Sequence, residues 1–395
     1  MLPLQAENDG ITLSTRLAEI YADQACSRTP RPEVWASLFL RERGRAGISG
    51  CEGYLYQPNR PWGVRESTDR SKCVSTDTEL LTIEGWKTFD LLREGDQIYS
   101  TDETGTLVED KIASIKVHGG PSVVIEFSQK YAFNMVVTPG HRCVIQSQHS
   151  KKPGYSDYRF VETDNLAKRH QIPRRPESID VDQIEVLEDD EVCLLAWVAS
   201  EGSYYRDPDK YRKLEKVTIH QSERANPEHC EEIQGLFDRI CQGSTFVSNR
   251  CRTWNLTGWG RELALTYLPE KQISGQLMRE LSPRQMEIFL KTFIKGDGND
   301  YHGDGDKWVI AQKDRSTLKE LQAMATVCGY TTTLRNERKD GASRLYITEH
   351  TKRTQVGPLD KKRRIWEHGV WSPTTSTGRW IARRNGAVFI TGNST

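Results

Sequence analysis

Residues 194–202 read LLAWVASEG, and residues 290–298 read LKTFIKGDG. Both segments are apolar, contain small side chains, and end in an acidic residue followed by glycine, which indicates a buried helix with a carboxylate at its end. The two acids, Glu201 and Asp297, are 297 − 201 = 96 residues apart. A pattern that occurs twice at such a long interval predicts two related units.

The segments that follow these two helices also match. A run rich in β-branched residues ends at Gln221, a similar run ends at Gln312, and helical periodicity follows each of them. The glutamines are 312 − 221 = 91 residues apart, close to the spacing of the acids. The sequence therefore predicts an α/β domain at 190–350 with two pseudo-symmetric halves, each a helix–strand–helix unit.

Short β-type segments stand on both sides of this domain. Runs such as VVIEF at 123–127 are short, rich in β-branched residues and separated by turn signals. Near the other end, Asn385-Gly386 is flanked by β-type residues, which is typical of a hairpin. We expect a multidomain chain in which an all-β domain, formed by 73–180 together with 351–393, encloses the α/β domain.

The composition is that of a soluble globular protein without a charge bias. Lys and Arg total 55, Asp and Glu total 55, and mean hydropathy is −0.66. The nine cysteines are scattered with no C-x-x-C pair, so neither a disulfide framework nor a structural zinc site is expected. No apolar run approaches the length of a membrane span, and no signal peptide is visible. We expect a cytoplasmic monomer without membrane contact.

Both ends of the predicted β domain carry reactive residue types. Cys73 opens the segment CVSTDTELLTIEGWKTFDLLREGDQI, which combines a cysteine, a short strand and a Gly-Asp turn. The sequence TPGH at 138–141 follows a predicted strand, and the last β segment runs into Asn393 and then Ser394. These blocks, in this order, resemble those of inteins, the self-splicing protein elements built on a Hint-type β domain.

The resemblance implies roles at the N-terminal junction. The Cys73 thiol attacks the carbonyl of Lys72 to form a thioester. Thr138 and His141 contact the scissile amide, and the imidazole donates to the departing nitrogen, because its ordinary pKa suits proton transfer near neutral pH.

The resemblance also implies roles at the C-terminal junction. The acyl group moves from the thiol to the hydroxyl of Ser394, and the side-chain amide of Asn393 then attacks its own carbonyl to form a succinimide. On this interpretation residues 1–72 are the end of an N-terminal host segment, or N-extein, and residues 394–395 begin the C-extein. Splicing itself requires no cofactor.

Two positions depart from the intein pattern. Many inteins have histidine before the terminal asparagine, and this chain has Gly392. Ser372 stands where Asp or Cys is usual. Since both missing groups assist the downstream steps, asparagine cyclisation is slower, or depends on another residue such as His141 or Arg379, and cleavage without ligation is an alternative outcome.

The two acid-glycine helices resemble the LAGLIDADG motifs of homing endonucleases. Two helices pack closely only where small residues line the contact. Ala196 and Ser200 are four residues apart in the first helix, and Thr292 and Gly296 are four apart in the second, so each pair shares one helix face.

That packing has a chemical consequence. It brings Glu201 and Asp297 side by side, and paired carboxylates bind hard divalent cations such as Mg²⁺. The resemblance implies that the metal activates water and stabilises the leaving oxygen, with one cut in each DNA strand. Lys271 resembles the lysine-bearing block between the motifs, where a cation polarises water or steadies the transition state.

The expected partner is double-stranded DNA, namely the allele of the host gene that lacks the intein, together with the flanking extein segments in cis. DNA affinity comes mostly from phosphate contacts by basic side chains near the repeated strands. The expected DNA contacts are Lys213, Lys216, Gln221, Lys307, Gln312 and Lys313, and the glutamines are alternatively supports for the carboxylates.

Two other functions stay open. The chain is alternatively a DNA endonuclease whose flanking β segments are only structural. It is alternatively a fragment of an ATPase with an inactive insertion, because joining Lys72 to Ser394-Thr395 gives Lys-Ser-Thr, which resembles the end of the phosphate-binding loop of phage terminases. Both glycines of that loop are replaced, by Glu66 and Ser71.

Overall fold

The computed structural model describes residues 72–130, 132–149, 154–206, 214–248, 251–300, 307–336 and 341–392. The proposed host segment 1–72, apart from Lys72, lies outside the described residues, as do Lys213, Asn393 and Ser394. Within these described ranges, no helix combines the length and apolarity that crossing a membrane requires.

An all-β part takes its strands from two separate stretches of the chain. The first stretch forms β1 (Val74–Ser75), β2 (Glu79–Thr82), β3 (Gly85–Lys87), β4 (Gln97–Thr101), β5 (Thr106–His118), β6 (Ser122–Gln129), β7 (Phe133–Val137), β8 (Arg142–Ser147), β9 (Arg159–Glu162), the 3-10 turn Thr163–Asn165, β10 (His170–Pro173) and β11 (Ser178–Ile179). The second forms β20 (Arg353–Gln355), β21 (Asp360–Trp366), β22 (Val370–Thr375), β23 (Arg379–Arg384) and β24 (Ala387–Gly392).

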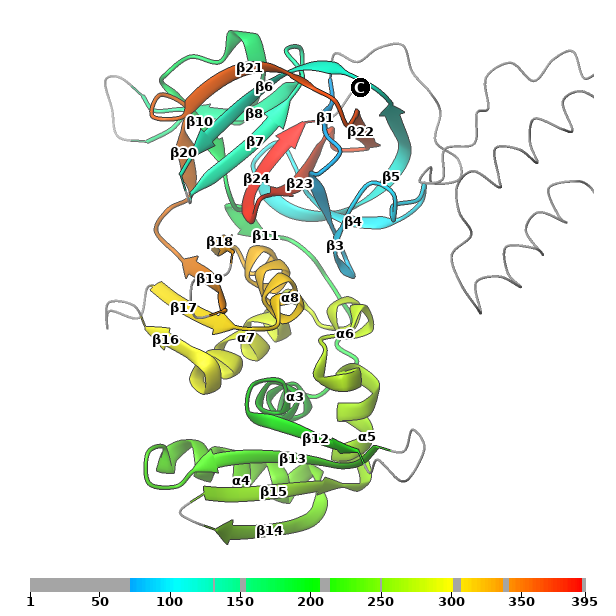
Figure 1. The fold of residues 1–395 in the computed structure, drawn as a ribbon, viewed down its shortest axis with the longest axis vertical. Helices are drawn as coiled ribbons and strands as arrows, with labels where there is room; N and C mark the ends of the chain where they lie inside the picture. Colours follow the sequence, from blue (N-terminus) through cyan, green and yellow to red (C-terminus); the bar gives the residue numbers. More distant parts are fainter. Residues whose placement is uncertain are drawn as a thin grey trace, which may run out of the picture. The chain divides into compact units, whose positions relative to one another are not determined.

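The two stretches interleave strand by strand. Strand β22 pairs with both β1 and β5, β21 pairs with β6, β23 pairs with β2, and β20 pairs with β10. Figure 1 shows the red strands of the second stretch among the blue and cyan strands of the first. Neither stretch completes the sheet alone, because each supplies neighbours that the other needs for its backbone hydrogen bonds.

The predicted hairpin at Asn385-Gly386 is confirmed. The turn joins β23 to β24, whose register runs from Arg384 opposite Ala387 to Arg379 opposite Gly392. Asn385 has φ 48° and Gly386 has φ 76°, the left-handed pair that a two-residue hairpin turn with the right twist requires.

The remaining described residues form two α/β halves. The first half contains α3 (Asp189–Glu201), β12 (Gly202–Arg206), β13 (Leu214–Ser222), α4 (Pro227–Ile240), β14 (Gln242–Ser248), β15 (Cys251–Thr257) and α5 (Gly258–Tyr267). A 3-10 turn (Pro269–Lys271) and α6 (Gly275–Glu280) connect it to the second half, which contains α7 (Pro283–Asp297), β16 (Gly298–Asp300), β17 (Lys307–Gln312), α8 (Arg315–Val327), β18 (Thr331–Arg335) and β19 (Ser343–Thr348).

The two halves have the same strand order. The first half forms a sheet with the order β12-β13-β15-β14, and the strands of the second half run β16-β17-β19-β18 at the end of a longer sheet that continues from β18 into β24. Gly202 pairs with Ile219 in the first half, and Gly298 pairs with Ile310 in the second, which matches the repeat read from the sequence. The pseudo-symmetry is confirmed, with one difference: each helix passes directly into a short strand, so the unit is helix–hairpin–helix.

The glycines after the two acids are needed for this passage from helix to strand. A Cβ added to Gly202 would lie 2.1 Å from the Val198 carbonyl oxygen, and one added to Gly298 would lie 2.6 Å from that of Ile294. No side chain fits against the last helical turn there, so each helix ends at its acid and the chain reverses at once.

Candidate functional site

The ends of α3 and α7 touch through small side chains, as expected. A Cβ added to Gly296 would lie 2.6 Å from Ser200 Oγ and 2.8 Å from Ser200 Cβ, so the helices approach too closely for a larger residue. One turn earlier, Thr292 contacts the sulfur of Cys193 at 3.8 Å. The close approach brings the last residues of both helices, Glu201 and Asp297, near enough for their charges to interact.

Each carboxylate is held by the glutamine of its own half. Gln221 Nε2 donates to Glu201 Oε1 at 3.3 Å, and Gln312 Nε2 donates to Asp297 Oδ2 at 2.7 Å. The same pair of residue types therefore makes the same contact twice, related by the repeat. The two glutamines were expected either as DNA contacts or as supports, and their hydrogen bonds are those of supports.

A third ionisable group faces both carboxylates. Lys271 Nζ donates to the Ser200 carbonyl at 2.9 Å, and it interacts electrostatically with Asp297 and Glu201. Lys271 and the preceding Glu270 have φ 65° and φ 56°, a backbone conformation that non-glycine residues rarely adopt. A strained turn thus presents the ammonium group to the acid pair.

The environment shifts the pKa of each of the three groups in the direction that favours its neutral form. Burial raises the pKa of Glu201, and the neighbouring charge of Asp297 raises it further, whereas Gln221 opposes the shift. Burial also raises the pKa of Asp297, against Gln312 and Lys271. Burial lowers the pKa of Lys271. The two facing, half-buried carboxylates therefore lack enough nearby positive charge to balance them when both are ionised.

This acid pair fits a divalent cation such as Mg²⁺. Carboxylate oxygens are its preferred protein ligands, and it usually takes one or two of them and completes its shell with water and phosphate. Among the described residues there is no cluster of three or more His, Cys, Asp or Glu that would enclose a metal. A site of this kind leaves ligand positions for a substrate.

The expected basic residues follow the sheets of the two halves. Lys216 and Lys307 are repeat equivalents, 307 − 216 = 91 residues apart, on β13 and β17. Lys216 is exposed, while the adjacent Val217 and Ile219 are buried, so Lys216 points away from the helices. Lys313 is exposed in the turn before α8.

A second cluster lies where the described chain begins. Cys73 is 2% exposed and directly precedes β1. Its N–H donates to Thr138 Oγ1 at 2.9 Å, and the N–H of Thr138 donates to the Cys73 carbonyl at 2.9 Å. The hydroxyl of Thr138 also donates to that carbonyl at 3.2 Å. Thr138 therefore forms hydrogen bonds with both the N–H and the carbonyl group of Cys73.

His141 lies between the segment of Thr138 and the last strand, β24. Its Nε2 lies 2.6 Å from Thr391 Oγ1, and both side chains are fully buried. Burial lowers the pKa of His141 to about 4, and an interaction with the Lys72 backbone opposes that shift. The interaction with Lys72 is loose, because Nδ1 makes no hydrogen bond of standard geometry within the described part of the chain.

The residue before position 393 is enclosed on all sides. A Cβ added to Gly392 would lie 2.4 Å from the Arg142 carbonyl oxygen and 2.8 Å from the ring of Phe160. The indole N–H of Trp380 donates to the Gly392 carbonyl at 3.1 Å. A side chain at this position, such as the histidine of the intein pattern, would not fit this backbone.

His141 and Arg379, the two residues expected to assist asparagine cyclisation in place of that histidine, both lie near the end of β24. His141 contacts Thr391, and Arg379 is the strand partner of Gly392 with its guanidinium 4.7 Å from the Phe160 ring. Ser372, the second departure, is buried in β22 and donates to the Pro373 carbonyl at 3.2 Å.

Sequence reasoning missed Thr391, Trp380 and Phe160, which surround the same junction. None of them belongs to a local motif. The one available signal is that Thr391 lies two residues before Asn393 in the sequence.

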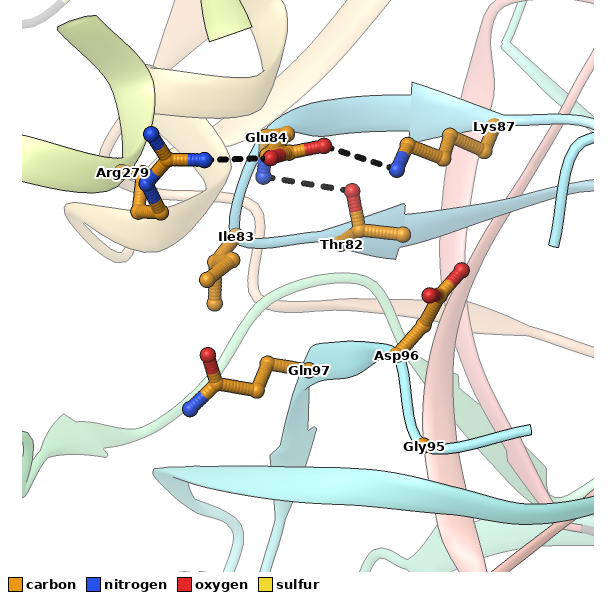
Figure 2. A pocket seen from close by; sticks show the side chains of 8 residues that line it. All are labelled: Thr82, Ile83, Glu84, Lys87, Gly95, Asp96, Gln97 and Arg279. Atoms are coloured by element: carbon orange, nitrogen blue, oxygen red, sulfur yellow. Dashed lines mark hydrogen bonds and ion pairs between the residues drawn. The ribbon is translucent and has the colours of Figure 1, made fainter. Parts of the chain in front are cut away.

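One cavity lies away from both clusters. It measures about 230 Å³ and is lined by Thr82, Ile83, Glu84, Lys87, Gly95, Asp96, Gln97 and Arg279. Figure 2 shows Glu84 between two cations, 2.8 Å from Lys87 Nζ and 2.6 Å from Arg279 Nη1. Gly95 and Asp96, the Gly-Asp turn noted in the sequence, are part of this lining, and the two cations of the cavity are both paired with Glu84.

No protein-family model matches this chain, and no curated protein matches it. Several solved structures are similar to part of it. Mesophilic variants of the homing endonuclease I-DmoI align with 40% of this chain and 88% of their own, at 16% identity and TM-score 0.32. The LAGLIDADG homing endonuclease I-GzeII, in complex with its DNA target, aligns with 40% and 78%, at 14% identity and TM-score 0.25. The homing endonuclease I-WcaI, bound to its DNA recognition sequence, aligns with 42% and 78%, at 11% identity and TM-score 0.27.

Proposed function

We propose that this chain is a protein-splicing element with a site-specific DNA endonuclease inside it. The observation that carries the splicing function is the position of His141. Its Nε2 lies 2.6 Å from Thr391 Oγ1, two residues before Asn393 in the sequence, and the same 138–141 segment carries Thr138, which accepts from the N–H of Cys73. Residues 73 and 391, more than 300 positions apart, are thus linked through this segment.

The first step is an acyl shift at Cys73. Its sulfur forms a bond to the Lys72 carbonyl carbon, the Lys72–Cys73 peptide bond breaks, and the thiol proton ends on the Cys73 nitrogen. Thr138 supports this step because it fixes the backbone on either side of the reacting nitrogen. The imidazole of His141, whose pKa is about 4, is neutral near pH 7 and donates a hydrogen bond at this peptide group without carrying a charge.

The remaining steps use the C-terminal junction. The Ser394 hydroxyl attacks the thioester, which frees the Cys73 thiol and forms an ester. The Asn393 side-chain nitrogen then attacks its own backbone carbonyl, which breaks the Asn393–Ser394 bond and leaves a succinimide. The freed amine of Ser394 takes the acyl group from its own oxygen, and Lys72 is joined to Ser394 by a peptide bond.

The endonuclease proposal rests on Glu201 and Asp297. The α3 and α7 ends hold the acids together, their glutamines orient them, and their raised pKa values reflect a need for positive charge. Mg²⁺ bound there would supply activated water and charge stabilisation for phosphodiester hydrolysis. Lys271 stabilises negative charge beside the pair, and Lys216, Lys307 and Lys313 contact phosphates.

The two activities are tested separately. Mass spectrometry of the full chain is expected to show a product in which the middle has left and residues 1–72 are joined to 394–395. Cys73→Ala with Asn393→Ala is expected to abolish this while Mg²⁺-dependent DNA cutting continues. An intact single species after long incubation of the unaltered chain would contradict splicing and favour the plain endonuclease.

Asp297→Asn provides the reverse separation. It removes one carboxylate of the pair and is expected to abolish Mg²⁺-dependent cleavage of DNA that carries the uninterrupted host gene. Splicing is expected to continue, since Asp297 lies in α7 and not in the β part. DNA cutting at the unaltered rate would refute the assignment of the metal site.

A further inference from the structure

The splicing steps above do not determine which ring nitrogen of His141 carries the proton. A neutral histidine ring has one N–H donor and one acceptor nitrogen, and which nitrogen carries the proton depends on its partners. His141 is fully buried, so water cannot exchange the two arrangements freely. Only one of them can polarise the bond that Cys73 attacks.

The surroundings select one arrangement. Nε2 is occupied by Thr391 Oγ1 at 2.6 Å, and Nδ1 is buried with no hydrogen bond of standard geometry among the described residues, so Nδ1 is the nitrogen left for the Lys72–Cys73 peptide group. The N–H of that peptide group already donates to Thr138, which leaves the Lys72 carbonyl oxygen, an acceptor, and the direction in which the Lys72 backbone moves the pKa of His141 agrees with this. The proton must then be on Nδ1, Nε2 must accept, and the Thr391 hydroxyl must donate.

We propose that Thr391 is a positioning residue for His141: its hydroxyl donates to Nε2, keeps the ring proton on Nδ1 and aims that proton at the Lys72 carbonyl oxygen. This role rests on the proposed splicing function. As Cys73 Sγ bonds to the carbonyl carbon, the oxygen gains negative charge and the loose contact with Nδ1 tightens. His141 donates a hydrogen bond and gives up no proton, so the atom balance of the acyl shift is unchanged.

The contact also links the two stretches of the β part. Thr391 lies on β24 and is the strand partner of Trp380 on β23. Cys73 and His141 come from the first stretch of the β part, and Thr391 comes from the second. The proposed positioning of His141 therefore requires residues from both stretches of the β part.

The test uses the full chain with Asn393→Ala and Ser394→Ala, which together stop the reaction at the thioester. Adding a small thiol then releases residues 1–72, and the rate reports the first step alone. Thr391→Val keeps the volume and removes the hydroxyl, and Thr391→Ser keeps the hydroxyl. Thr82→Val is the matched control, because Thr82 is equally buried and its hydroxyl donates to the Gly85 carbonyl, away from His141.

The expected result is a loss of about tenfold in cleavage rate for Thr391→Val, which is smaller than the roughly hundredfold or greater loss when a donor to a developing oxyanion is removed, because His141 itself remains. Thr391→Ser and Thr82→Val are expected to stay within about threefold of the parent. In the non-reacting Cys73→Ala and Asn393→Ala background, ¹H–¹⁵N correlation spectra are expected to show His141 protonated at Nδ1. In Thr391→Val the ring is expected to become a mixture of the forms protonated at Nδ1 and at Nε2.

Two failures are distinguishable. If the parent shows no thiol-dependent cleavage after Lys72, the splicing function falls and this role falls with it. If the parent cleaves and Thr391→Val cleaves equally fast, only this role is overturned. Equal slowing by Thr391→Val and Thr391→Ser, with the Nδ1 proton unchanged in both, would mean that Thr391 is merely structural and would also overturn the proposal.

Discussion

The backbone N–H of Cys73 donates to Oγ1 of Thr138 at 2.9 Å. That N–H belongs to the peptide bond proposed to break, and it is buried with its residue. The hydroxyl fixes the orientation of the amide plane before any chemistry begins, because the same threonine also holds the Cys73 carbonyl through its own N–H at 2.9 Å.

Replacing Thr138 by valine is expected to slow the first step. The change removes the hydroxyl that accepts from the Cys73 N–H, and losing a partner of a buried donor costs about 1–3 kcal/mol. Thioester formation, measured as thiol-induced release of residues 1–72, should fall by roughly tenfold or more. Thr138→Ser should recover most of the rate, and equal rates for the valine variant and the parent would contradict the role of Thr138.

Restoring the histidine that inteins usually carry before the terminal asparagine is expected to harm this protein. A Cβ on Gly392 meets the Arg142 carbonyl oxygen at 2.4 Å, and backbone cannot move away cheaply. Gly392→His and Gly392→Ala should both lower the melting temperature and slow release at the C-terminal junction. Gly235→Ala is the control, because a Cβ there meets only the flexible end of Arg239, at 3.2 Å. Faster C-terminal cleavage in Gly392→His would contradict this expectation.

The acid pair is expected to make metal-free stability depend on pH. The pKa values of Glu201 and Asp297 are raised by folding, so their contribution to stability is present below their ordinary pKa values and is lost as pH rises through the raised ones. Asp297→Asn should therefore raise the melting temperature near about pH 8 without metal, and should lose the stabilisation that added Mg²⁺ gives the parent. Calorimetry at two pH values, with and without Mg²⁺, measures both effects. A variant that Mg²⁺ stabilises as much as the parent would place the metal elsewhere.

Glu320 predicts a second pH effect. Its Oε2 is buried without a hydrogen-bond partner among the described residues, although the stem of the side chain is partly exposed. Burial raises the pKa of Glu320 to about 7, against the opposing charges of Arg383 and Lys319, and Glu79 raises it further. Its contribution to stability is therefore complete below its ordinary pKa of 4.5 and is lost as pH rises through about 7.

Glu320→Gln is expected to remove that loss. The variant should be more stable than the parent near about pH 8, while the difference should shrink or reverse near about pH 5. Thermal unfolding at the two pH values measures it, and Glu262→Gln, at an exposed position of α5, is the control. Parallel pH profiles of the melting temperature for the parent and Glu320→Gln would contradict this prediction, because ionising this carboxyl would then not destabilise the fold.

The features that the sequence predicted are those with a period or a local pattern. The repeated acid-glycine helices predicted two halves with one strand order and a close contact through Ser200 and Gly296, because small residues four apart mark a helix face. The hairpin at Asn385-Gly386 followed from the left-handed backbone that this dipeptide favours. Lys271 was expected beside the acid pair on resemblance alone, and it lies there.

The features that escaped prediction depend on contacts between distant strands. Thr391 meets His141 across 250 residues, and Gly392 is enclosed by Phe160 and the Arg142 carbonyl, which no local pattern records. The boundaries of the β and α/β domains stay predictions, as do the roles of Asn393, Ser394 and Lys213.

The pairing of β10 with β20 places Pro173 opposite Arg353. The segments before and after the α/β halves therefore lie on adjacent strands, about 5 Å apart, although β11 follows β10 in the chain and pairs with β5. Apart from β11, the strands and helices between β10 and β20 belong to the two α/β halves. Removing the residues between β11 and β20 is expected to keep that pairing and to expose the edge of β24 that pairs with β18 through Ala387 and Thr333. The β part is therefore expected to fold without the two α/β halves, with one strand edge left open to solvent.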